Sequence, residues 1–236
     1  MSNPSATSST LEPVVTISQD RDIVTAIKRF DVPSDQQAEA VQKAADHIAQ
    51  EWKGDSKFVG AILLRGRDQG GVSCYAQWKS PTDGEEPSAP VASRSLAVAL
   101  PTFKLLDSRT YTVEFTDQAE SMTPPTQVSM QTPYAHFGIF SVTRENQDRL
   151  LDLARKYAPK SLTTPGLLAI DFHRSIDGLQ VINLGVWTTF DDFNFLIQRP
   201  GFRDDNLYWE GVADFQGVFF DVVAVEVGHS RQPLTR

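Results

Sequence analysis

The stretch Val181-Ile-Asn-Leu-Gly-Val-Trp187 decides the expected fold. It is apolar apart from one asparagine, and successive side chains of a β-strand alternate between the two faces of a sheet, so Asn183 and Trp187 would share one face. The stretch Val72-Ser-Cys-Tyr-Ala-Gln-Trp78 has the same length and the same final residue. The two tryptophans lie 109 residues apart, at positions 78 and 187, and we interpret this spacing as an internal repeat.

The repeated unit is predicted to follow a β-α-β-β-α-β order. In the first copy, short apolar runs bounded by turn residues predict strands at 23–30, 58–67, 72–79 and 110–115. Apolar residues at steps of three and four predict an amphipathic helix between Pro33 and Gly54, with Ser34 and Gln37 as its capping box. A broken second helix is expected at 95–106, where Pro101 limits its length.

The second copy repeats this order. Strands are predicted at 136–142, 166–174, 179–187 and 215–227, and a helix from Thr143 to Pro159. The phenylalanine-rich segment 190–197 is predicted to be a short helix, with a further helical turn at 206–212. Phe30 and Phe140 lie 110 residues apart, within one residue of the spacing of the tryptophans.

These elements predict an α+β protein made of two tandem ferredoxin-like units. We expect a disordered tail at 1–20, an N-terminal unit at 21–116, a linker at 117–134, a C-terminal unit at 135–228 and a tail at 229–236. Helices cover only one face of each sheet, so the uncovered faces are expected to pack on each other. The result would be a dimeric α/β barrel formed within one chain.

Composition excludes several classes of function. The formal charge of −8 and the isoelectric point near 5.0 leave no basic surface for nucleic acid. The sequence has no apolar run of roughly 20 residues, so a membrane span is not expected and a cytoplasmic location is. Cys74 is the only cysteine, and the four histidines show no metal-binding spacing, so no metal site is predicted.

The pair Asp177-Gly178 favours a two-residue hairpin turn, which sets the register of the two strands beside it. Phe172 would then lie opposite Asn183, Ile170 opposite Gly185 and Leu168 opposite Trp187. Asp171 and His173 would fall on the opposite face of the sheet, whereas a three-residue turn would reverse this assignment.

The repeated unit, Pro165-Gly166 at the start of a strand and Asn183-Leu-Gly-Val-Trp187 together resemble the antibiotic biosynthesis monooxygenase superfamily of dimeric α/β-barrel proteins. The likeness covers most of the second half and the first half more loosely. Fused chains of this size are similar to the oxygenases that open a ring of angucycline polyketides. The resemblance implies a metal-free oxygenase of antibiotic biosynthesis that uses O₂ on a polycyclic aromatic polyketide. It would either oxidise a quinol or anthrone or cleave a ring C–C bond.

The resemblance also implies roles for particular residues. Asn183 and Trp187 would be catalytic, together with an arginine that is either Arg199 or Arg203. Cys74 stands where the first unit would carry its asparagine, so that unit is expected to hold a degenerate site. Phe193 stands where quinone-forming members have a tyrosine, which removes a hydroxyl. The residues expected to bind the flat substrate are Phe172, Phe193, Phe202, Tyr208, Trp209 and Trp78.

A cofactor-free oxygenase must form an electron-rich phenolate or carbanion that can pass electrons to O₂. The amide of Asn183 could bind a substrate carbonyl or phenolate, an arginine could neutralise its charge, and the indole of Trp187 could donate its N–H or stack on a ring. If reduced flavin supplies the electrons instead, it would be a diffusible co-substrate delivered by a flavin reductase, because the sequence has no glycine-rich dinucleotide motif.

Other interpretations remain open at the level of sequence. The protein could instead bind a small molecule without catalysis, or degrade haem, which would require an axial histidine in the pocket. Asp171, His173 and His136 are interpreted as structural polar groups, and Cys74 as a small buried apolar residue. A homodimer of the fused barrel is a further expectation.

Overall fold

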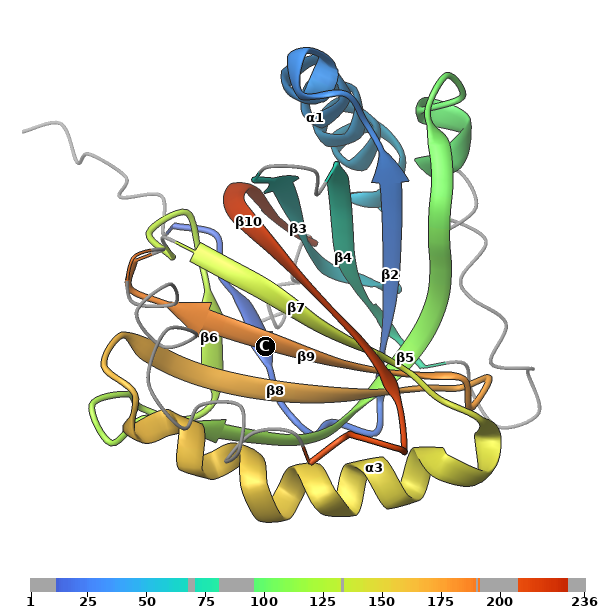
Figure 1. The fold of residues 1–236 in the computed structure, drawn as a ribbon. Helices are drawn as coiled ribbons and strands as arrows, with labels where there is room; N and C mark the ends of the chain where they lie inside the picture. Colours follow the sequence, from blue (N-terminus) through green and yellow to red (C-terminus); the bar gives the residue numbers. More distant parts are fainter. Residues whose placement is uncertain are drawn as a thin grey trace, which may run out of the picture.

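The computed structural model describes residues 12–67, 71–80, 96–132, 134–189, 191 and 208–228. Eight strands form one closed barrel, in the order β10-β3-β4-β2-β5-β8-β9-β7. The strands of the barrel are β2 Ile23–Asp31, β3 Phe58–Gly66, β4 Val72–Lys79, β5 Lys104–Gln118, β7 Tyr134–Ser141, β8 Leu167–Ser175, β9 Gln180–Trp187 and β10 Asp214–Val227. The two ferredoxin-like units predicted from the sequence are therefore present as two halves of a single barrel (Figure 1).

The two longest strands join the halves. The first part of β5 pairs with β2 of its own unit, and its second part pairs with β8 of the other unit. In the same way β10 pairs with β7 at its beginning and with β3 at its end. Each of these two strands therefore pairs with strands of both units, so the barrel has no unpaired edge strand between the units.

Helices cover the outside of the barrel. In the N-terminal unit a 3₁₀ turn at Ser34–Gln36 leads into α1, Gln37–His47, which continues as a π-helical turn at Ile48–Trp52. In the C-terminal unit α3, Arg144–Tyr157, runs beneath β8 in Figure 1 and is followed by a 3₁₀ segment, η3, at Ala158–Thr163. Among the described residues, no helix is long and apolar enough to cross a membrane.

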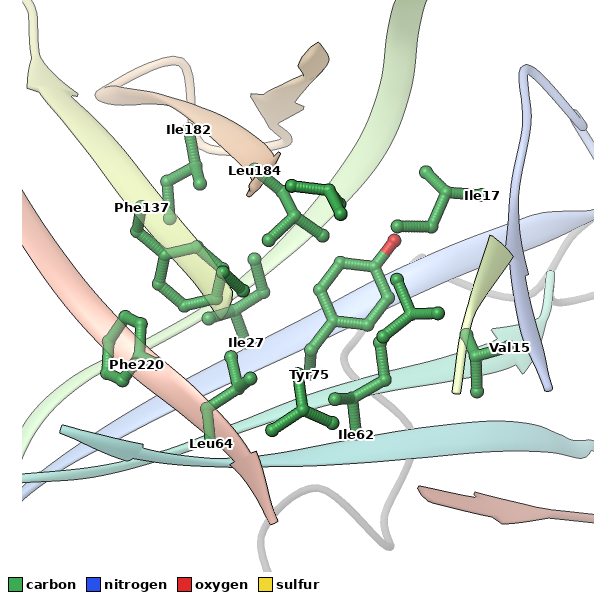
Figure 2. Packing of buried hydrophobic residues seen from close by; sticks show 14 of the residues in the cluster. Val15, Ile17, Ile27, Ile62, Leu64, Tyr75, Phe137, Ile182, Leu184 and Phe220 are labelled. Carbon is green, nitrogen blue, oxygen red and sulfur yellow. The ribbon is translucent and has the colours of Figure 1, made fainter. Parts of the chain in front are cut away.

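The inside of the barrel is packed with apolar side chains from both units. Figure 2 shows Ile27 and Tyr75 of the N-terminal unit against Phe137 and Leu184 of the C-terminal unit. Alternate residues of the same strands point outward and form two further clusters under the helices. The faces that the helices leave uncovered are thus buried against each other, as predicted.

Several local expectations were wrong. Residues 15–17, expected in the disordered tail, form strand β1, Val15–Ile17, which pairs with β6, Thr126–Val128, inside the expected linker. The expected capping box does not form, because α1 begins at Gln37 and no side chain caps it. The helix expected at 95–106 is helical only at 96–99, and Lys104 already belongs to β5. The helix expected at 190–197 lies outside the described residues apart from Asp191.

Candidate functional site

A cavity of about 120 Å³ lies on the outer face of the C-terminal half-barrel. It is bounded by β7, β8, β9 and β10, by η3 and by the turn at residues 208–209. Its aromatic walls are Phe140, Trp187, Tyr208, Trp209, Phe215 and Phe219. A dry engineered cavity of about 150 Å³ can hold one benzene molecule, so the enclosed space suits about one aromatic ring.

The floor of the cavity is flat because two of its residues are glycines. Gly138 of β7 pairs with Gly217 of β10 on one side and with Asn183 of β9 on the other. All three residues line the cavity. A Cβ atom at Gly138 would come within 3.3 Å of the Phe215 ring, so a side chain there would fill the space. The glycines let a planar ligand lie directly against the peptide backbone.

Asn183 supplies an unsatisfied hydrogen-bonding atom at the edge of this floor. Its Oδ1 is buried and accepts no hydrogen bond from the described protein. Buried polar atoms are satisfied in most folded proteins, and an orphaned acceptor costs roughly 1–3 kcal/mol. A ligand with a hydroxyl group would satisfy it.

His136 and Trp187 form a second polar feature of the cavity. The indole Nε1–H of Trp187 donates to Nδ1 of His136 at 2.8 Å, and the ring of Phe219 stacks on the imidazole with centroids 5.6 Å apart. The opposite face of the imidazole lies over Gly185, where an added Cβ would be 2.0 Å from its Cε1. Burial lowers the pKa of His136 to about 4, opposed by a hydrogen bond with the backbone of Gly185, so this imidazole is neutral at pH 7.

The turn before β10 carries two of the aromatic walls. The backbone N–H groups of Val212 and Ala213 both donate to the carbonyl of Trp209 at 2.9 Å, and Gly211 adopts a φ of 70° that closes the turn. Trp209 contacts Phe215, with ring centroids 4.7 Å apart, and Tyr208 packs edge-on against Trp209. Burial raises the pKa of Tyr208, which keeps its phenol neutral.

The structure brings together only some of the residues that the sequence pattern singled out. Asn183, Trp187, Tyr208 and Trp209 line the cavity. Phe172 pairs with Asn183 as expected, but its ring stacks between Phe115 and Phe140 in the cluster beneath α3 and does not line the cavity. The remaining predicted site residues of this unit, Phe193, Arg199, Phe202 and Arg203, lie outside the described residues.

The register of the β8–β9 hairpin agrees with the expected two-residue turn in all but its last pair. Phe172 lies opposite Asn183 and Ile170 opposite Gly185. Trp187 lies opposite Leu167 rather than Leu168, because the register shifts between Leu167 and Ala169. His136 was interpreted as structural and instead lines the cavity, since β7 and β9 place it beside Gly185.

The matching positions of the N-terminal unit are filled. Strand pairing aligns Ala26 with His136, Lys28 with Gly138, Cys74 with Asn183 and Trp78 with Trp187. Trp78 was predicted to bind substrate, but it is fully buried and packs at 5.2 Å from the ring centroid of Trp52. Among the described residues its Nε1 has no hydrogen-bond partner, and alanine occupies the position of the histidine. The described residues of this unit therefore form a closed core where the C-terminal unit has a cavity.

Asp171 and His173 lie on the inner face of the barrel, away from the cavity. Nε2 of His173 lies 3.0 Å from the Tyr75 hydroxyl, and Thr126 donates to Asp171 Oδ1 at 2.9 Å. Burial raises the pKa of Asp171 to about 8 and lowers the pKa of His173 to about 4, so both are neutral at pH 7. Within the described ranges, no three histidine, cysteine, aspartate or glutamate residues lie close enough together to hold a metal ion.

Comparison with known protein families gives a match for one part of the chain. Residues 133–204 match the model of the antibiotic biosynthesis monooxygenase family, and this segment contains Asn183, Trp187 and His136. The family match thus covers most of the C-terminal unit and none of the N-terminal unit. No curated protein matches the sequence of the chain significantly.

Solved structures share the fold of the whole chain. An anthrone oxidase-like protein matches 95% of this chain over 100% of its own, with 17% identity and a TM-score of 0.73. A putative monooxygenase from Fusobacterium nucleatum matches 87% of this chain over 94% of its own, at 12% identity and a TM-score of 0.57. A putative monooxygenase from Lactobacillus acidophilus NCFM matches 88% over 97%, at 8% identity and a TM-score of 0.53. These likenesses show that the chain shares the fold of these proteins over most of its length.

Proposed function

We propose that the protein is an oxygenase that uses O₂ to oxidise a polycyclic aromatic polyketide in antibiotic biosynthesis, with its active site in the C-terminal cavity. The observation that carries this proposal is a flat, aromatic-walled cavity with one buried, unsatisfied amide oxygen at its edge. The family of the C-terminal domain and the fold shared with an anthrone oxidase-like protein support the reaction class.

The oxidation balances without an external reductant. An anthrone loses both hydrogens of the methylene carbon to be oxidised, whereas a phenol loses one hydrogen from the ring carbon and one from its hydroxyl group. In both cases this carbon gains one oxygen atom of O₂ as a carbonyl, and the other oxygen atom leaves as water. The substrate supplies all four electrons. In the ring-opening alternative, one oxygen atom enters a C–C bond and the other leaves as water, so two electrons must come from a reductant. Reduced flavin, delivered by a separate reductase, would supply them.

Asn183 is the proposed substrate-binding and catalytic group, and Trp187 forms part of the wall that holds the ring. Arg199 or Arg203 is proposed to neutralise the developing phenolate or enolate. A polycyclic substrate exceeds the enclosed volume, so only the reacting ring would be fully enclosed.

Haem degradation is less well supported by this cavity. His136 is the histidine that this alternative requires in the pocket, but its Nδ1 already accepts a hydrogen bond from Trp187. A cavity of about 120 Å³ is also far smaller than a porphyrin of four pyrrole rings. A binding protein without catalysis is the other alternative, and only turnover separates it from an oxygenase.

Oxygen uptake with a reduced anthrone or hydroxynaphthalene substrate tests the proposal, using protein treated with a chelator, with and without reduced flavin, and with product mass as the readout. Uptake without flavin and a product of quinone mass would support the four-electron reaction. Asn183→Leu should lower the rate at least 100-fold, whereas Cys74→Ser at the matching N-terminal position should leave it unchanged. Absence of enzyme-dependent uptake under every condition would favour the binding-protein alternative.

The pH profile gives an independent check. The two described titratable residues of the cavity, His136 and Tyr208, are both neutral across the range from pH 6 to 10, because burial lowers the pKa of the first to about 4 and raises the pKa of the second. We therefore expect kcat/KM to rise with pH according to the pKa of the substrate hydroxyl. Substrates with a more acidic hydroxyl should shift the profile to lower pH by the same amount.

A further inference from the structure

Trp187 has two ways to contact a ligand, through the face of its ring or through its single N–H group. That N–H is directed at Nδ1 of His136 at 2.8 Å, and an indole has no second donor. Because Nδ1 accepts this bond, the neutral imidazole must carry its proton on Nε2. Phe219 on one face and Gly185 on the other leave the imidazole no room to swing away. The donor of Trp187 is therefore engaged before any ligand enters.

The N-terminal unit provides an internal comparison. Ala26 occupies the position of His136, and the matching indole of Trp78 has a buried Nε1 that bonds to none of the described residues. The tryptophan alone therefore does not determine where its N–H points or whether it is satisfied. In the C-terminal unit, His136 accepts a hydrogen bond from the indole N–H of Trp187 and thereby fixes its direction.

Asn183, four residues before Trp187 on β9, presents a hydrogen-bond acceptor to the cavity. Oδ1 of Asn183 is a buried acceptor that receives no hydrogen bond from the described residues, at the edge of the floor formed by Gly138 and Gly217. A ligand oxygen that can only accept would meet this carbonyl oxygen without a hydrogen bond, at a cost of roughly 1–3 kcal/mol. A ligand hydroxyl would satisfy it.

We propose that the cavity selects an aromatic ring bearing a free hydroxyl, which donates to Oδ1 of Asn183, while His136 holds Trp187 so that the indole contacts the ring only through its face. His136 is then a positioning residue that acts through Trp187. This inference deepens the proposed function, since it names the protonated phenol as the form that binds. It assigns recognition to Asn183 alone among the polar groups of the described cavity.

Three probes with the same naphthalene ring test this division of roles: 1-naphthol, 1-methoxynaphthalene and naphthalene. Wild-type protein should bind 1-naphthol about tenfold more tightly than either of the others. Asn183→Leu should abolish this preference, and Asn183→Ser, which keeps an acceptor in a smaller side chain, should retain part of it. In His136→Leu the indole N–H is released, so 1-methoxynaphthalene should gain affinity relative to naphthalene.

The resonances of the four indole N–H groups, observed with ¹⁵N-labelled tryptophan, report directly on Trp187. The Trp187 resonance, assigned by its loss in Trp187→Phe, should respond equally to all three probes in wild-type protein. A shift caused only by the oxygen-bearing probes would overturn the positioning role of His136. Equal affinity for 1-naphthol and 1-methoxynaphthalene, tighter binding of the ether, or no binding of any probe would overturn the assignment of Asn183.

These readouts are separate from oxygen uptake. Probe selectivity without any turnover would retain the recognition scheme and reject the oxygenase. Turnover without probe selectivity would support the oxygenase and reject the recognition scheme.

Discussion

Gly185 determines the position of the His136 imidazole by having no side chain. The imidazole lies where a Cβ would stand, and this contact brings Nδ1 to the indole of Trp187. A methyl group at this point cannot be accommodated by a small shift, because the nearest atom belongs to a ring packed against Phe219.

We therefore expect Gly185→Ala to break the bond between Trp187 and His136 and to lower the free energy of unfolding by about 1–3 kcal/mol. The Trp187 indole N–H resonance should move upfield, and chemical denaturation would give the stability change. Gly217→Ala is the matched control, since its Cβ would lie 3.7 Å or more from any neighbour. An unchanged Trp187 indole resonance in Gly185→Ala would contradict the role of Gly185 in positioning His136.

A second prediction concerns Asp171 inside the barrel. Burial raises the pKa of this carboxyl to about 8, so the folded protein holds a proton that the unfolded chain releases near pH 4. Its stabilising contribution is fully present below pH 4 and is lost as the pH rises through 8. Asp171→Asn should thus become progressively more stable than wild-type protein across this window, by at most about 1.4 kcal/mol per pH unit. Parallel urea denaturation of both proteins at pH 5, 6.5 and 8 checks this, and a constant difference would contradict it.

Asn183 and Trp187 could be placed on one face from the sequence, because side chains alternate between faces along a strand and both residues belong to the same strand. His136 is 51 residues from Trp187 and joins them only through the pairing of β7 with β9. The repeat could have revealed it, since antiparallel pairing of the first and third strands of each unit places His136 opposite Gly185. The arginine assignments rest on a segment that the described structure does not include.

At the scale of elements, the β1–β6 ribbon seals part of the barrel. Val15 and Ile17 of β1 and Val128 of β6 belong to the cluster inside the barrel, and the Gln77 side chain donates to the carbonyl of Thr16 at 2.8 Å. This ribbon was missed because strands of three residues carry too little pattern to be separated from a polar tail or linker. The eight barrel strands were predicted because each spans at least eight residues of regular pattern.

Truncation of the Ile17 side chain measures how much the β1–β6 ribbon contributes to the stability of the fold. Ile17 is fully buried, so Ile17→Ala should lower the free energy of unfolding by about 2–4 kcal/mol. Thr16→Ala on the exposed side of the same strand should change it by less than about 0.5 kcal/mol. Thermal or urea denaturation would compare the two variants. If residues 15–17 had no structural role, both substitutions would change the free energy of unfolding by the same small amount.

At the scale of the whole molecule, the exchanged strands β5 and β10 make each unit part of the other's sheet. The position of the C-terminal cavity is nevertheless filled in the described part of the N-terminal unit, where Trp52 and Phe58 pack on Trp78 and Lys28 stands in the place of Gly138. We expect calorimetric titration with 1-naphthol to give one bound ligand per chain. Trp52→Ala should cost about 3–5 kcal/mol of stability and open a second, weaker site.

That second site lacks the asparagine and the histidine, so it should not prefer 1-naphthol to naphthalene. Its Trp78 N–H has no partner, which should favour 1-methoxynaphthalene instead. Two equivalent sites in wild-type protein would contradict the closed N-terminal core.

The covalent joining of the two units also changes what a single substitution can do. In a barrel made of two identical subunits, every amino-acid change appears twice, so a tryptophan that fills one cavity necessarily fills the other. Here the two units carry different side chains, so one unit can be optimised as a rigid support around Trp52 while its neighbour keeps an open space for chemistry. The fused chain thereby separates two requirements, stability and access, that identical subunits must meet with one set of side chains.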